Sequence, residues 1–115
     1  MALSETHQNS ATITTAERFL ASNSTSKTDQ TTDGVYQLFL ELNNLAAGDI
    51  YQIKVYERIS SGGTARVVYI DNVTGPLDSP MYASPTLILL HGWEFSLVKI
   101  SGTDRAIAWS IRSVA

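Results

Sequence analysis

Apolar and polar side chains alternate through most of the chain after residue 34. Over residues 35–42 every second position is a large apolar residue, and Gln37 and Glu41 take positions between them. Alternation of this kind predicts a β-strand with one buried face. The pattern recurs over residues 50–59, 65–73, 93–97 and 105–112, and the side chains expected to point inward are Tyr36, Leu38, Leu40, Leu42, Tyr51, Ile53, Val55, Ile59, Val67, Tyr69, Val73, Trp93, Phe95, Leu97, Ile107, Trp109 and Ile111.

Turn-forming residues separate these strands and indicate how they connect. The loops at residues 60–64 and 101–104 contain glycine, and each predicts a hairpin. All three prolines lie within residues 75–85, which we expect to be a crossover or an edge, because proline cannot donate to an inner ladder. Residues 86–90 are apolar on both sides, as in a short strand covered on two faces. The sequence therefore predicts an all-β fold, an antiparallel β-sandwich or jelly-roll-like domain.

The first 33 residues differ in composition from the rest, since 13 of them are Ser or Thr. A segment this polar buries too little apolar surface to offset its ordering entropy. We therefore divide the chain into a polar N-terminal arm and linker, residues 1–33, and a sandwich domain, residues 34–115. Within the first part, residues 1–9 and 21–33 are expected to order only against another surface. Residues 10–20 fit a strand or a short helix, with the strand slightly favoured.

Composition and charge argue against several classes of binding partner and of chemistry. The net charge is −3 and the eight Lys and Arg residues are scattered singly, so nucleic acid is not an expected partner. The longest apolar run, residues 87–90, is far shorter than the roughly 20 residues of a membrane span. No signal peptide is visible at the start of the sequence. Cysteine is absent, which excludes disulfides and thiolate chemistry.

Candidate catalytic and metal-binding residues are few. His7 and His91 are too far apart in the sequence for a zinc-type spacing, and His91 with nearby Glu94 lacks a recognisable nucleophile motif. Only a fragment of a calcium loop is present, at residues 71–75. We expect no enzyme activity, no cofactor and no metal; a cluster of His91, Glu94 and Asp104 in space would reopen the enzyme hypothesis.

Two arginines begin the return strands of the predicted hairpins. Arg66 and Arg105 could each meet a carboxylate on a partner subunit, because arginine is enriched at interfaces. The alternative is a modest ion pair within the chain, such as Arg105 with Asp104 or Asp49 with Arg58.

Aromatic residues supply the remaining interface candidates. Most tyrosines fall on positions expected to face the core, and Tyr56 and Tyr82 are the two expected to reach the surface. Phe19, in the mixed patch of the N-terminal part, joins them. The possible interface residues are thus Arg66, Arg105, Tyr56, Tyr82 and Phe19.

A family resemblance covers roughly residues 34–112. Residues 48–69, with the second half at 84–93, Gly102-Thr103-Asp104-Arg105 and Trp109, resemble small all-β proteins encoded among the virion genes of tailed bacteriophages. The resemblance rests on hairpin turns and strand patterns. It implies a non-enzymatic capsid decoration or cement protein, located on the capsid surface of the virion.

The resemblance leads to a specific hypothesis and leaves one alternative. The sandwich would bind the major capsid protein and self-associate, with a trimer as the expected oligomer, while residues 1–33 drape over the major capsid protein or an adjacent copy. Deleting those residues would then abolish capsid binding and leave the sandwich folded. The alternative is a tail- or fibre-associated module that binds a host-surface glycan through Tyr82, Asp78 and Arg66.

Overall fold

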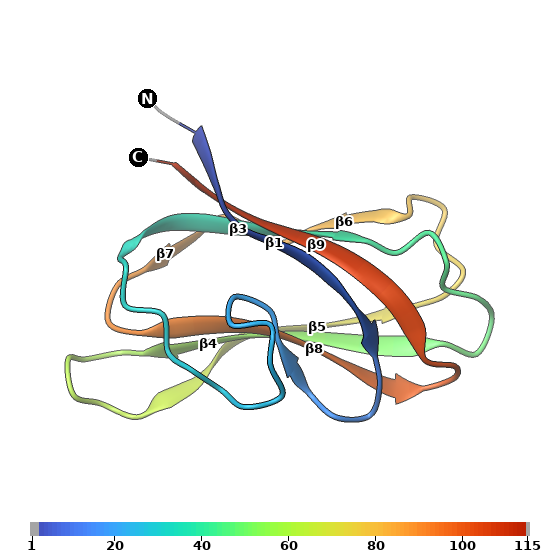
Figure 1. Cartoon of the computed structure of the whole chain (residues 1–115), viewed down its shortest axis with the longest axis horizontal. Helices are drawn as coiled ribbons and strands as arrows, with labels where there is room; N and C mark the ends of the chain where they lie inside the picture. The colour runs from blue at the N-terminus through green and yellow to red at the C-terminus, as the bar shows by residue number, and fades with distance from the viewer. Residues whose placement is uncertain (1–2, 115) are drawn as a thin grey trace.

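Two antiparallel sheets pack face to face in the computed structural model, which describes residues 3–114 (Figure 1). Sheet A has the order β1-β9-β3, and the short strands β6 and β7 both pair with the far side of β3. Sheet B has the order β2-β8-β4-β5. The all-β sandwich prediction is confirmed. The strands are β1 (Leu3–Ile13), β2 (Arg18–Phe19), β3 (Gly34–Glu41), β4 (Ile50–Arg58), β5 (Ala65–Thr74), β6 (Met81–Ala83), β7 (Leu87–Leu89), β8 (Trp93–Ser101) and β9 (Arg105–Val114).

The core lies between the sheets and is built from the predicted alternating positions. The inward residues of β3, β8 and β9 are all buried, and both tryptophans are among them. The Trp93 ring lies 4.3 Å from Tyr36 and 5.7 Å from Phe95, measured between ring centroids. The Trp109 indole donates its hydrogen bond to the carbonyl oxygen of Leu20 at 3.0 Å. Aromatic packing with satisfied N–H groups is what a dry core of this kind requires.

The N-terminal segment is part of the sandwich, contrary to our expectation of a separate arm. Residues 3–13 form strand β1, which pairs along its length with β9. Ile13 is fully buried, and the His7 ring packs edge-on against Trp93 at 6.1 Å. Composition misled here because β1 is an edge strand with most of its side chains in solvent, so polar residues suit it. The strand interpretation of residues 10–20 holds for Ser10–Ile13 and for the two residues of β2.

The connection at residues 101–104 is a crossing between sheets, and the predicted second hairpin is wrong. Strand β8 pairs with β2 and β4 in sheet B, whereas β9 pairs with β1 and β3 in sheet A. The hairpin between β4 and β5 is confirmed. The proline-containing segment behaves as expected, since it carries the chain from β5 in sheet B to the edge strand β6 of sheet A.

Several side chains face the other way from the prediction. Ile59 follows the end of β4 and is 74% exposed, and Val67 is also exposed. Strand β7 is covered on one face only, because Leu89 is buried while Ile88 is 80% exposed. The described residues form strands and loops, and no helix among them is long and apolar enough to cross a membrane.

Candidate functional site

The outer face of sheet A carries an unusual row of apolar side chains. The cross-strand pairs are Leu3 with Val114, Val114 with Val35, and Val35 with Ile88. Directly opposed residues point to the same face, so these four side chains cross β1, β9, β3 and β7 in one line. Their face is the solvent side of the sheet, because the next residue of β3, Tyr36, is buried in the core. We call this set the apolar row.

The row is strongly exposed at both ends. Leu3 is 78% exposed and Ile88 is 80% exposed, and Leu90, two residues further along on the same parity as Ile88, is also exposed. The outer face of an antiparallel sheet is normally polar. Scattered apolar residues at a surface need no explanation, but an aligned and contiguous group is typical of a binding surface.

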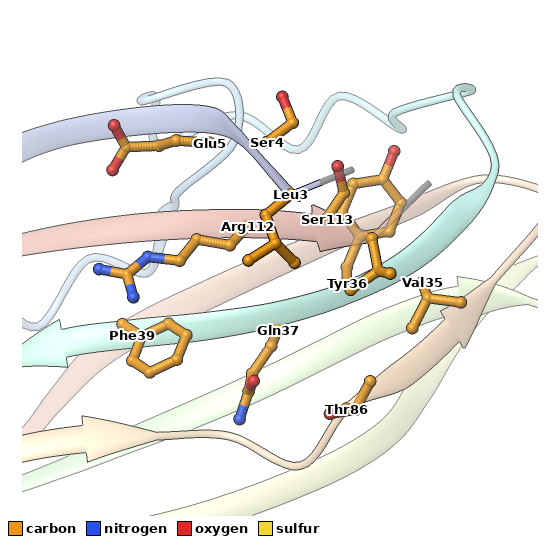
Figure 2. A pocket seen from close by; sticks show the side chains of 11 residues that line it. Leu3, Ser4, Glu5, Val35, Tyr36, Gln37, Phe39, Thr86, Arg112 and Ser113 are labelled. Carbon is orange, nitrogen blue, oxygen red and sulfur yellow. The ribbon is translucent and has the colours of Figure 1, made fainter. Parts of the chain in front are cut away.

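A groove of about 330 Å³ lies on the same face, and three residues of the apolar row, Leu3, Val35 and Val114, line it (Figure 2). The ring of Phe39 lies in its wall, and the Arg112 guanidinium stacks over that ring at 4.1 Å from its centroid. The lining residues are Leu3, Ser4, Glu5, Val35, Tyr36, Gln37, Phe39, Thr86, Arg112, Ser113 and Val114.

Hydrogen bonds hold the polar side chains of this groove in place. The Arg112 Nε donates to the Ser110 hydroxyl at 3.2 Å, and that hydroxyl donates to the Glu5 carboxylate. The amide of Gln37 donates to the carbonyl oxygen of Ser84 at 2.6 Å. The groove therefore presents a fixed cation over an aromatic ring next to an apolar row, an arrangement suited to a protein segment with mixed character.

Two of the sequence-predicted interface residues meet on the outer face of sheet B. The rings of Phe19 and Tyr56 lie 5.9 Å apart, and Phe19 is buried. The Tyr56 hydroxyl donates to Glu17 at 2.9 Å, and the Ser96 hydroxyl donates to the same carboxylate. Burial, followed by the hydrogen bond and charge of Glu17, raises the pKa of Tyr56 to about 12. Tyr56 is thus half-buried and holds the N-terminal segment against sheet B.

Arg105 is committed to an ion pair inside the chain. Its Nε donates to Asp49 at 2.9 Å, and neither predicted pair, with Asp104 or between Asp49 and Arg58, is formed. The Asp49 carboxylate also accepts the backbone N–H groups of Ala46 at 2.8 Å and Thr103 at 2.9 Å. These two backbone hydrogen bonds, and then Arg105, lower the pKa of Asp49 to about 2. This buried carboxylate fixes the crossing between β8 and β9.

The other residues of those predicted ion pairs have different partners. Asp104 pairs with Lys99 at 2.6 Å, and Arg58 pairs with Asp29 at 2.7 Å.

Tyr82 and Arg66 lie apart from these two groups. The Tyr82 hydroxyl, on β6 of sheet A, donates to Asp71 on β5 of sheet B at 3.1 Å, and Tyr69 donates to the same carboxylate oxygen at 3.4 Å. Burial and these neighbours raise the pKa of Tyr82. Arg66 is exposed and forms no ion pair with any residue between 3 and 114.

The three residues that would have reopened the enzyme hypothesis do not meet. His91 lies before strand β8 and Asp104 lies after it, so the nine residues of the strand separate them. Glu94 is buried and accepts the N–H groups of Ala21 at 2.8 Å, Ser22 at 3.2 Å and Phe95 at 2.9 Å. Burial raises the pKa of Glu94. Its position shows a structural role in holding the loop after β2.

Most of the calcium-loop fragment lies within a strand. Residues 71–74 of the calcium-loop fragment belong to β5, and residues 3–114 contain no group of three or more His, Asp or Glu that could hold an ion.

Sequence reasoning missed the apolar row. A signal was available, because Val35 and Phe39 are apolar on the parity of β3 that Gln37 and Glu41 mark as outward. No protein-family model, curated protein or solved structure matches this chain.

Proposed function

We propose that this protein is a virion structural protein, a decoration or cement protein that binds the major capsid protein on the outside of a phage head. The observation that carries the proposal is the apolar row of sheet A, which is strongly exposed at both ends and contributes three residues to the Arg112 groove. The resemblance of residues 34–112 to small all-β phage virion proteins supplies the class of partner.

The proposal places attachment on a sheet face. Residues 3–13 contribute Leu3 to that face as part of β1, so the N-terminal segment takes part as a strand of the sandwich. Burying a large aliphatic side chain contributes about 1.5–3 kcal/mol. Leu3 and Ile88 are exposed enough to gain most of that on contact. A modest affinity per copy suffices when many copies bind a repeating lattice.

The first experiment is mass spectrometry of purified virions that encode the protein, with its copy number measured against the major capsid protein. We expect on the order of hundreds of copies per particle, because a capsid lattice repeats its binding sites by symmetry. A handful of copies, or none, would overturn the proposal. A handful of copies would favour the glycan-binding module of a tail or fibre.

A binding assay with capsids that lack this protein then tests whether the apolar row of sheet A is the attachment surface. Ile88→Lys places a charge in the apolar row, and we expect it to weaken capsid binding by at least about tenfold. The matched control is Ile100→Lys, the same change at an exposed position of β8 in the other sheet. Equal binding by the two variants would contradict attachment through sheet A.

A further inference from the structure

Strand β5 lies at one edge of sheet B, and its outer side is not paired with any strand among the residues that the structure describes. It runs for ten residues, and its one strand partner among residues 3–114 is β4. The outward backbone N–H and C=O groups of such a strand are a template for another strand. The opposite edge of sheet B, β2, has only two residues, and both outer strands on the β3 side of sheet A have three. The other long edge strand, β1, differs from β5 because most of its side chains are polar.

The side chains of β5 favour pairing as well. Val67 is 43% exposed, Val68 is 41% exposed and Ile70 is 53% exposed. Its sequence from 66 to 73, Arg-Val-Val-Tyr-Ile-Asp-Asn-Val, combines high β-propensity with balanced charge and no proline. The lysine and proline residues that usually protect a free edge are missing from this strand.

The register of β5 on β4 shows which side chains share a face. Arg66 lies opposite Glu57 and Asp71 lies opposite Ile53, and these two β4 residues have the same parity. Val67 and Ile70 lie opposite Tyr56 and Lys54, on the other face. The irregularity in pairing near Val68 allows Arg66 and Asp71, five positions apart, to face the same way.

These positions make the edge complementary to itself. If two antiparallel copies of β5 meet around Tyr69, Arg66 of each lies opposite Asp71 of the other, and Val67 lies opposite Ile70. Opposed residues in each pair share a face, as an antiparallel ladder requires. Opposite charges and paired β-branched residues are both favourable across strands. Arg66 has no ion-pair partner within residues 3–114, and Asp71 accepts only from the Tyr69 and Tyr82 hydroxyls there.

We propose that β5 pairs with β5 of a second copy, so that two four-stranded B sheets join across a twofold axis. The pairing occupies the β5 edge of each copy and closes at a dimer by the twofold axis, in place of the trimer expected from the resemblance. It does not depend on the capsid proposal, because the contact lies on sheet B and is measured on the isolated protein.

The test is a charge swap in the full chain, read by sedimentation velocity over a range of protein concentrations. We expect the unaltered protein to form dimers, and Arg66→Glu or Asp71→Lys alone to raise the dimer dissociation constant by at least about tenfold through like-charge opposition. The double variant Arg66→Glu/Asp71→Lys restores the opposed charges and should recover the dimer. Circular dichroism on every variant separates lost pairing from lost folding.

Ile88→Lys is the control for self-association through the other sheet, and it should leave the dimer intact. A monomer at every concentration, a trimer, or a dimer that survives both single charge reversals would overturn the proposal. Loss of the dimer in Ile88→Lys would do so too.

Discussion

Replacing Ile13 by alanine tests whether the N-terminal segment belongs to the folded core. Ile13 is the last residue of β1 and is fully buried between the sheets, whereas Leu3 in the same strand is 78% exposed. If β1 were a polar arm, neither substitution would change the stability of the sandwich. The structure predicts a large effect at one position and almost none at the other.

The expected magnitude follows from the atoms removed. Ile13→Ala deletes three buried carbon atoms, worth about 0.8 kcal/mol each, or about 2.4 kcal/mol in total. The cavity left in the packed core adds to this, and the sum of about 3 to 4 kcal/mol lies within the range observed for such truncations. A domain of this size has a total stability of only about 5–15 kcal/mol. At about 4 °C per kcal/mol, the melting temperature should fall by about 12 °C or more.

Urea unfolding followed by tryptophan fluorescence measures this change, since Trp93 and Trp109 are both buried. The matched control, Leu3→Ala, should stay within about 0.5 kcal/mol of the unaltered protein. The reasoning is refuted if Ile13→Ala is as stable as Leu3→Ala, because β1 would then contribute nothing to the core. An equally large loss in Leu3→Ala would contradict its exposure.

Three further predictions concern single sites. Asp49→Asn should flatten the pH dependence of the urea midpoint between about pH 4 and pH 2. In the folded protein the pKa of Asp49 is lowered from 3.8 to about 2, so its carboxylate stabilises the fold above pH 4, and this stabilisation is lost as the pH falls through 2. Gly102→Ala should destabilise the protein by more than about 1 kcal/mol in the same assay, since φ is +95° and the new Cβ would clash with Asp49 Oδ1 and lie 2.6 Å from Asp49 Cα. Gly62→Ala, with φ of +79° and open space around the new Cβ, should cost less. Glu17→Gln should lower the pKa of Tyr56 from about 12 in an ultraviolet titration, with Tyr56→Phe identifying the signal, and an unchanged titration would contradict the contact with Glu17.

Alternation predicted the strands of the core but could not predict which strands pair. Residues of β3, β4, β8 and β9 point inward as expected because each strand has one face on the core. The turn before β9 looks like a hairpin in sequence, yet the Asp49 carboxylate binds it and directs β9 into the other sheet. That contact joins residues more than fifty positions apart, and local pattern carries no information about it.

The alternation of apolar and polar residues also does not show which outward side chains are buried by a neighbouring loop. Glu94 and Ser96 have the parity of an outward face, but residues 17–22 lie over that face, where Ala21 and Ser22 contact Glu94 and Glu17 contacts Ser96. The outward parity of Val35 was visible in the sequence, but its alignment with Ile88 and with residues from both ends of the described chain was not. The site exists only once the strand order is known.

The place of β9 in sheet A sets the order in which this protein can fold during synthesis. β9 is the last strand of the described chain to leave the ribosome, yet it separates β1 from β3 and pairs with both. Sheet A therefore cannot form strand by strand as the chain emerges, because Leu3 can pair with Val114 only after β9 has been synthesised. Pairing across so long a stretch of chain makes folding slow. A nascent chain that stalls before residue 105 exposes the unpaired edges of β1 and β3, so complete translation is a condition for a closed sandwich.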